Sequence, residues 1–290
     1  MWHEYTLSSW AEYEDCIDRL PRGKWIFRGQ ANASWQLESS LYREFSKVKQ
    51  LYKEIGLDVE INYNRYELKL LREFTSSYNL YSNHKLYEPE SSEYKEIARY
   101  RQEAWSLMQH HGAPTRLIDW TYSPYVAAFF ALDGASEDYC IYALDPIALK
   151  RVDDQRINPA QYDRSLASSL ETKTPSFIKT FEPYSKNERI RRQQGLFLVP
   201  NQNNESLSSV LNSYNLIDGK IAGEGMYVAH KFVFPKQLIL DSWNKLQQMN
   251  INHETLYAGL DGFSKSLRLK LLDHDFLTIS TSEQLKYKEV

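Results

Sequence analysis

The sequence lacks the features that mark disulfide-built, secreted and membrane-spanning proteins. Only two of its 290 residues are cysteines, Cys16 and Cys140, and neither belongs to a Cys-x-x-Cys pair or a His/Cys metal spacing. A disulfide framework is therefore excluded as the basis of the fold, and a reducing, cytoplasmic location is expected. The N-terminus has no basic region followed by an apolar run, so no secretory signal is expected.

Long apolar runs and an excess of positive charge are also missing. The longest apolar stretch, Tyr125 to Leu132, has the length of a buried helix and is much shorter than the ~20 residues that span a bilayer. We expect no membrane partner. The formal net charge is -3 and there is no basic tail, so net charge does not indicate a nucleic-acid partner, although it does not exclude one.

Composition and periodicity then predict the fold class. Hydrophobic residues make up 42% of the chain and aromatic residues 14%, enough for a sizeable core in one large domain. Apolar residues at helical spacing or in β-rich runs predict the following elements. Helices are expected over 11–20, most of 60–109 with a break at 87–92, 124–132, and much of the chain after Pro235. Strands are expected at 24–28, 139–144, 196–199 and 231–234, with a short extended run at 115–119.

This order predicts an α+β fold with a mixed or antiparallel sheet core and segregated helices. Residues 1–234 are expected to form an α+β domain, and residues 235–290 a helical C-terminal extension packed on it. The polar stretch 151–188 is expected to be a loop with short helices, which could include a mobile lid. Ser123-Pro124 predicts a helix start, with serine as N-cap and proline in the first turn.

The first candidate for a working site is Phe27-Arg28-Gly29-Gln30. An arginine at the end of a strand presents a planar and permanently charged fork, and the next glycine lets a ligand or a backbone approach closely. This combination suits phosphate or carboxylate. The alternative is a surface arginine followed by a turn glycine.

The second candidate is the run from Gln109 to Thr121, which gathers His110, Thr115, Arg116, Asp119 and Thr121 into thirteen residues. It leads into a buried helix whose N-terminus favours negative charge. The alternative is a buried polar turn in which Arg116 pairs with Asp119 while the threonines cap backbone groups. Zinc binding by the adjacent histidines lacks an i, i+4 pair and a third ligand, so no metal is expected.

The third candidate is Arg189-Ile190-Arg191-Arg192-Gln193-Gln194-Gly195-Leu196-Phe197. A cationic stretch precedes a glycine and a strand, and could supply a second phosphate contact or an amide that orients a substrate. The alternative is a solvated basic turn.

At these three places the sequence resembles the FRG-domain family of bacterial proteins, over roughly residues 20 to 200. The family's Phe/Tyr-Arg-Gly opening is similar to Phe27-Arg28-Gly29, and its Gln-His-x-Gly-x-Pro-Thr-Arg-Leu-Leu-Asp-Trp-Thr run is similar to Gln109 to Thr121. The Ser-Pro helix and the Arg-Ile-x-x-Gln-x-Gly-x-Phe element are similar to Ser123 to Ala131 and Arg189 to Phe197. A later Leu-Phe-Pro-Asp-Leu-Asp-Gly run is only partly kept in Leu256 to Gly262, where Ala258-Gly259 replaces Pro-Asp.

A more distant resemblance is to arginine-type ADP-ribosyltransferases. It implies that NAD is a substrate, that Arg28 holds its pyrophosphate, and that Thr115 or Thr121 bonds the nicotinamide ribose. Trp120 or a tyrosine would stack on the nicotinamide. Asp119 or His110 would stabilise an oxocarbenium-like state or activate the acceptor. Phe27, Gly29, Gln30 and Arg116 complete the implied binding residues.

The third candidate departs from that enzyme pattern, because Gln193 stands where a glutamate is expected. A neutral amide can orient a ribose but cannot stabilise positive charge, so Asp119, Glu188 or Glu224 would have to act instead. The first hypothesis is an NAD- or nucleotide-dependent effector of the ADP-ribosyltransferase or NAD glycohydrolase class, in a toxin or phage-defence system. The second is a non-catalytic module that senses a nucleotide, nucleic acid or protein through the same cleft. The third is a nuclease that uses His110 and Asp119.

Overall fold

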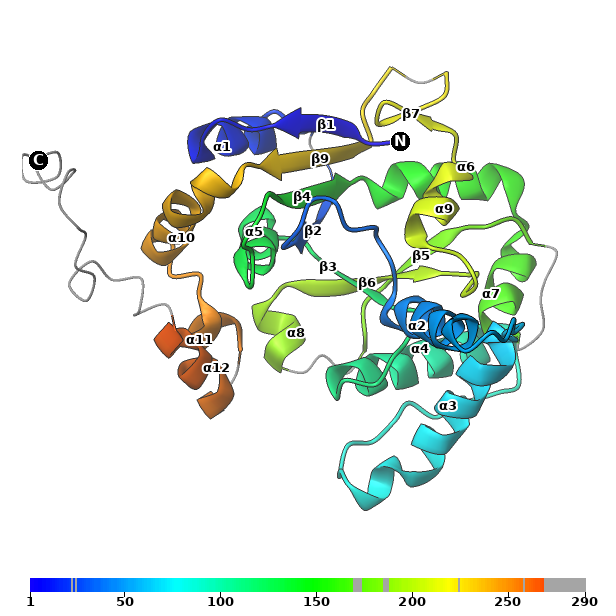
Figure 1. Ribbon diagram of the computed structural model, residues 1–290. Coiled ribbons are helices and arrows are strands. Elements are labelled where there is room, and N and C mark those ends of the chain that lie inside the picture. The colour runs from blue at the N-terminus through cyan, green and yellow to red at the C-terminus, as the bar shows by residue number, and fades with distance from the viewer. Residues whose placement is uncertain are drawn as a thin grey trace, which may run out of the picture.

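In the computed structural model, one seven-stranded sheet runs through the middle of the molecule (Figure 1). The structure describes residues 1–21, 23, 25–168, 174–184, 188–223, 225–257 and 259–268. The strand order across the sheet is β1 (His3–Thr6), β9 (Ala229–Phe234), β4 (Tyr139–Leu144), β2 (Ile26–Gln30), β3 (Ile118–Thr121), β6 (Gly195–Pro200) and β5 (Ile178–Phe181). β1 and β9 run parallel, and every other neighbouring pair is antiparallel. The predicted α+β fold with a mixed sheet is confirmed.

Helices cover both faces of the sheet. One face carries an apolar cluster with α6 (Pro146–Arg156) and α9 (Leu207–Asn212). The other face is divided in two. Its β1-β9-β4-β2 half packs against α1 (Trp10–Asp18), α5 (Pro124–Leu132) and α10 (Ile239–Gln248). Its β3-β6-β5 half packs against α4 (Tyr94–His110) and α7 (Pro159–Ala167), and α3 (Tyr63–Ser77) adds Leu71 to the same cluster. A boundary between two cores therefore crosses this face near β2 and β3.

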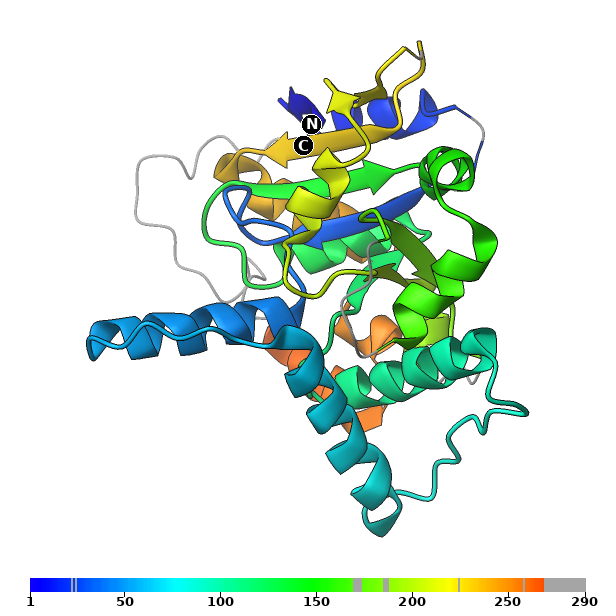
Figure 2. The ribbon, with the colours of Figure 1, turned by 90° about the vertical axis from the view of Figure 1, so that its right-hand side faces the viewer.

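The remaining elements are short or lie at the periphery. α2 (Ser40–Glu54) and α3 project away from the sheet, as Figure 2 shows. The other elements are 3-10 helices Tyr78–Leu80 and Lys236–Leu238, α8 (Glu188–Arg192), the β7 (Leu216–Ile217) and β8 (Lys220–Ile221) hairpin, α11 (His253–Leu256) and α12 (Gly259–Ser266). Within the described residues, none of the helices is both long enough and apolar enough to cross a membrane.

Several local predictions agree with the structure. The Pro124 to Leu132 helix and the Tyr139 to Leu144 strand have the expected bounds. The expected N-cap is present, since Ser123 Oγ accepts a hydrogen bond from the Val126 N–H at 3.2 Å. α2, β1 and β5 were not predicted, and Lys24, where the second strand was expected to begin, lies outside the described residues.

The expectation that Gly29 ends its strand is wrong, because β2 continues to Gln30. The glycine is required by packing. A Cβ at Gly29 would lie 2.0 Å from the Ala127 carbonyl oxygen and 2.4 Å from the Ala131 nitrogen. Its role is to let the backbone of α5 close directly onto β2.

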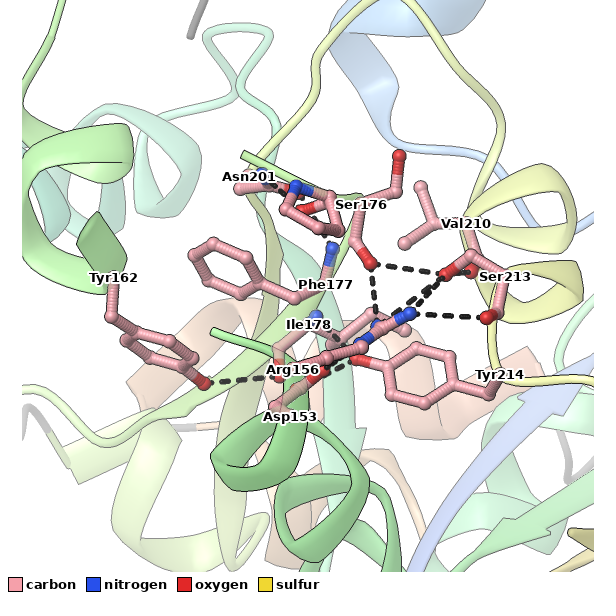
Figure 3. Close-up of polar contacts among 11 residues, drawn as sticks. Asp153, Arg156, Tyr162, Ser176, Phe177, Ile178, Asn201, Val210, Ser213 and Tyr214 are labelled. Carbon is pink, nitrogen blue, oxygen red and sulfur yellow. Dashed lines mark hydrogen bonds and ion pairs between the residues drawn. The ribbon is translucent and has the colours of Figure 1, made fainter. Parts of the chain in front are cut away.

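A separate, buried polar network connects α6 to β5 and to the end of α9 (Figure 3). Arg156 Nη2 donates to Asp153 Oδ1 at 2.8 Å, and Arg156 Nη1 donates to the Ser213 carbonyl at 3.0 Å. The Tyr214 hydroxyl donates to Asp153 Oδ2 at 2.8 Å and accepts from the Ile178 N–H at 2.8 Å. Burial raises the pKa of Asp153, and the bonds from Arg156 and Tyr214 oppose this. The network satisfies its buried groups internally, which makes it part of the scaffold.

Candidate functional site

β2 and β3 separate just after they meet, and Arg28 fills the opening. The two strands share the register pair Phe27 and Thr121. One residue further along β2, Arg28 Nη1 donates to the Asp119 carbonyl oxygen at 2.6 Å. A side chain thus provides the link that a backbone N–H would provide in a continuous ladder. The first and second motifs therefore meet within the sheet.

A cavity of about 330 Å³ lies beside this opening. It is at the lower end of the ~300–1,000 Å³ range of small-molecule sites. Its walls come from all three motifs, from α5 and from the segment after α11. The lining residues are Phe27, Arg28, Gly29, Asp119, Trp120, Thr121, Ala127, Phe130, Arg189, Ile190, Gln193, Gly195, Leu196, Phe197 and Tyr257.

Arg28 and Arg189 supply the positive charge of this cavity. Arg28 is half-buried, and its Nε is buried without a hydrogen-bond partner. Burial lowers the pKa of the Arg28 guanidinium, and the Asp119 carboxylate opposes this shift. An arginine nevertheless stays protonated in proteins. Arg28 thus places a cation beside the cavity and has one buried donor that no protein group accepts.

Asp119 is the single carboxylate among the described residues that line the cavity. Its side chain is exposed, and Oδ2 accepts from Gln109 Nε2 at 2.7 Å. Of the other candidate acids, Glu188 pairs with Arg192 at 2.7 Å and does not line the cavity. Glu224 lies outside the described residues. Of the three candidate acids, Asp119 is therefore the one that the structure places at the cavity.

Gln193 and Thr121 line the cavity but use their polar groups on the protein itself. Gln193 Nε2 donates to the Leu256 carbonyl at 3.3 Å. The Thr121 hydroxyl donates to the Gln193 carbonyl at 2.7 Å and accepts from the Ser123 N–H at 3.0 Å. These contacts tie the β3–α5 turn, α8 and α11 together around the cavity.

The proposed stacking of Trp120 on a ligand does not fit its environment. The residue lines the cavity, yet its indole is only 3% exposed and packs in the apolar cluster with α6 and α9. Side chains alternate along a strand, so Asp119 and Thr121 project to the opposite face from Trp120. The tyrosine that lines the cavity is Tyr257.

Arg116 belongs to the core. Its Nε donates to Glu67 at 2.6 Å and its Nη2 makes a second bond to the same carboxylate, while Nη1 donates to the Asn201 carbonyl at 2.8 Å. The Trp105 ring lies 4.8 Å from the guanidinium carbon. The residue is 2% exposed and does not line the cavity, so both the expected ligand contact and the alternative pairing with Asp119 are corrected. Its positive charge is already neutralised by Glu67.

Three further predicted site residues do not reach the cavity. Thr115 is fully buried, and Gln30 donates to the Gln36 carbonyl at 3.1 Å. His110 is exposed at the end of α4, with its ring 4.9 Å from that of His111. Desolvation, followed by the neighbouring charges of His111 and Arg189, lowers the pKa of His110. The neutral imidazole is therefore its main form at pH 7.

Two aromatic residues of the cavity were not predicted. Phe130 follows Phe129 on α5, and only Phe129 is fully buried in the core. Tyr257 follows α11 and lies with its ring 5.0 Å from the Arg189 guanidinium carbon. Burial raises the pKa of the Tyr257 hydroxyl, which stays protonated at neutral pH. The partly kept Leu256 to Gly262 run was the only sequence signal near it.

No cluster of three or more His, Cys, Asp or Glu side chains that could hold a metal ion occurs in the described part of the chain. The fold and the site together define an α+β protein with a cationic, aromatic-walled cavity at an opening between two strands. Residues 23–140 match the model of the FRG domain, and the chain therefore contains an FRG domain. That segment holds the first two motifs, while Arg189 and Tyr257 lie beyond it. No curated protein matches the chain, and no solved structure does.

Proposed function

We propose that the cavity binds NAD or a related nucleotide and that the protein acts on it as an ADP-ribosyltransferase or NAD glycohydrolase. The observation that carries this proposal is the buried Arg28 Nε, which has no partner and belongs to a residue lining the cavity. A buried donor without an acceptor is costly to leave unsatisfied. A phosphoryl oxygen is an acceptor that suits a guanidinium well.

The other walls suit the remaining parts of a nucleotide. Arg189 supplies a second cation, and Phe130 and Tyr257 supply aromatic surface for a base. Stacking on aromatic side chains stabilises a bound base by roughly 1–3 kcal/mol. The combination of two arginines and two aromatic rings favours an aromatic ligand with phosphate groups over a simple anion.

Asp119 would carry the chemistry. In NAD hydrolysis the bond between the nicotinamide nitrogen and ribose C1′ breaks, and its electron pair leaves with the nicotinamide. Water then bonds to C1′ and releases one proton. The Asp119 carboxylate would stabilise the positive charge that develops on the ribose and accept that proton. In transfer, a nucleophile of a macromolecular acceptor takes the place of water.

This activity would give the protein an effector role. A protein that consumes NAD in the cytoplasm of a bacterium would stop growth, as a toxin or a phage-defence effector does. A second candidate function is a nucleotide sensor without catalysis. It is favoured by Gln193, a neutral amide on the cavity wall where the enzyme pattern has a glutamate.

The proposal is tested by incubating the full chain with NAD and measuring released nicotinamide, with NAD affinity measured by calorimetry. We expect Arg28→Lys to lower affinity by about tenfold or more, because hydrogen bonds to charged groups contribute ~1.5–3 kcal/mol. Arg189→Ala should weaken binding in the same direction. Arg191→Ala is the matched control, since Arg191 lies on the same helix, is exposed and does not line the cavity.

Three outcomes separate the candidates. Nicotinamide release that Asp119→Asn abolishes while NAD still binds supports the enzyme. Arg28-dependent binding of NAD that remains chemically unchanged supports the sensor. Binding and turnover that respond equally to the Arg189 and Arg191 substitutions, or that ignore Arg28, would contradict the assignment of the cavity.

A further inference from the structure

A chain of three polar side chains leads from the core to the cavity. Thr115 is fully buried, Gln109 is half-buried and Asp119 is exposed. The Thr115 hydroxyl donates to Gln109 Oε1, and Gln109 Nε2 donates to Asp119 Oδ2 at 2.7 Å. All three residues belong to the second motif, yet only Asp119 lines the cavity.

The orientation of the Gln109 amide is fixed by its neighbours. The Thr115 hydroxyl oxygen accepts a hydrogen bond from the Leu117 N–H at 3.2 Å, and the hydroxyl proton is donated to Gln109 Oε1. Turning the amide over would place Oε1 against the Asp119 carboxylate, which can only accept hydrogen bonds when ionised. Only the observed orientation of the Gln109 amide gives both Gln109 Oε1 and the Asp119 carboxylate a hydrogen-bond donor.

Thr115 is itself held by the start of α2. The Thr115 N–H donates to Ser40 Oγ at 3.0 Å, and the Thr115 carbonyl accepts from the Leu41 N–H at 3.0 Å. The same carbonyl accepts from the Ser40 hydroxyl at 3.2 Å. The first member of the chain therefore has both its backbone groups bonded, and cannot shift without breaking the contact with α2.

We propose that Thr115 and Gln109 are positioning residues that hold the Asp119 carboxylate at the edge of the cavity. Arg28 fixes the Asp119 carbonyl, at 2.6 Å, while Gln109 fixes its carboxylate, so that main chain and side chain are both held. An exposed aspartate without such support would occupy several rotamers. A fixed carboxylate is what a site that stabilises developing charge requires. The catalytic consequence rests on the proposed function; the positioning itself does not.

The first experiment is structural and needs no ligand. Crystal structures of the full chain with Thr115→Val, which keeps the size but loses the hydroxyl, and with Thr115→Ser, which keeps the hydroxyl, are compared with the wild type. We expect the Asp119 carboxylate to leave Gln109 or to occupy several rotamers in the valine variant, and to stay in place in the serine variant. An unchanged Asp119 in the valine variant would overturn the proposal. If that variant does not fold, Gln109→Met tests the same link.

The second experiment asks whether Thr115 acts through Asp119. We expect Thr115→Val to lower the rate of nicotinamide release about tenfold in the wild type and less than twofold when Asp119 is already asparagine. Ser165→Ala controls for the loss of a buried hydroxyl elsewhere, since Ser165 is 6% exposed and does not line the cavity. Equal effects in the two backgrounds would overturn the coupling. A wild type that releases no nicotinamide would count against the proposed function, and the crystal structures would still decide on the positioning.

Discussion

Two arginines from the first two motifs differ in what surrounds their charge. The guanidinium of Arg116 donates to the Glu67 carboxylate on one side and to the Asn201 carbonyl on the other, so its charge is already paired inside the protein. Arg28 lines the cavity, donates to one carbonyl and has a buried Nε without a partner. Both are arginines, and each belongs to one of the candidate motifs. The unpartnered donor is what makes Arg28, and not Arg116, the arginine proposed to bind a ligand.

The structural role of Arg116 gives a testable outcome. Glu67→Gln removes the negative partner of Arg116 and leaves a buried guanidinium uncompensated. Because breaking a buried ion pair typically costs about 3–5 kcal/mol, we expect the free energy of unfolding to fall by that amount. Denaturant unfolding measures the loss. Glu73→Gln is the matched control on α3, because its pair with Lys69 at 3.8 Å is exposed and contributes about 0.5 kcal/mol or less. Equal, small losses in both variants would show that the Arg116 pair does not hold the fold together.

At the scale of elements, α5 and β2 are in close contact at Gly29, and both contribute residues to the lining of the cavity. We expect Gly29→Ala to lower the unfolding free energy by about 3 kcal/mol or more. Overpacking typically costs ~1–3 kcal/mol, and here the added methyl would meet helix backbone, which moves only as a unit. The measurement is again denaturant unfolding.

The control for this variant is Gly225→Ala, where an added Cβ meets nothing within 4 Å. A surface change of this kind is expected to stay within about 0.5 kcal/mol. If Gly29→Ala were as mild as the control, the close approach of α5 to β2 would not be a feature of the folded protein.

Elements whose identity depends on local pattern could be predicted from the sequence. The helix from Pro124 has an N-cap, a first-turn proline and an unbroken apolar run, and the strand from Tyr139 is a β-rich run closed by Asp-Pro. The end of β2 could not be predicted, because it depends on a helix that begins almost a hundred residues later. The pairing of Arg116 with Glu67 was missed for the same reason, since Glu67 belongs to a helix well before it in the sequence.

The candidate site, like the fold, could be predicted only in part. The meeting of Arg28 with the segment that ends at Thr121 followed from their motifs, and the structure places both at one cavity. The contribution of Tyr257 could not be found in this way. It depends on how the chain after α10 returns to α8, where Arg192 donates to the Thr255 carbonyl at 3.2 Å.

At the scale of the whole molecule, the cavity lies where two cores meet on one face of the sheet. Phe27 and Ala127 of one core and Phe197 of the other core all line it. α8 and Tyr257 complete it. Parts of the chain from residue 27 to residue 257 therefore contribute to one cavity, which lies at a junction within the fold rather than on one loop.

The central claim is that this junction receives a phosphate-bearing nucleotide through Arg28. The most direct test is a crystal structure of the full chain with ADP-ribose. We predict ligand density in the cavity bounded by Arg28, Arg189 and Tyr257, with a phosphoryl oxygen within hydrogen-bond distance of Arg28 Nε. ADP-ribose bound elsewhere on the molecule, or bound here with no contact to Arg28, would contradict the account.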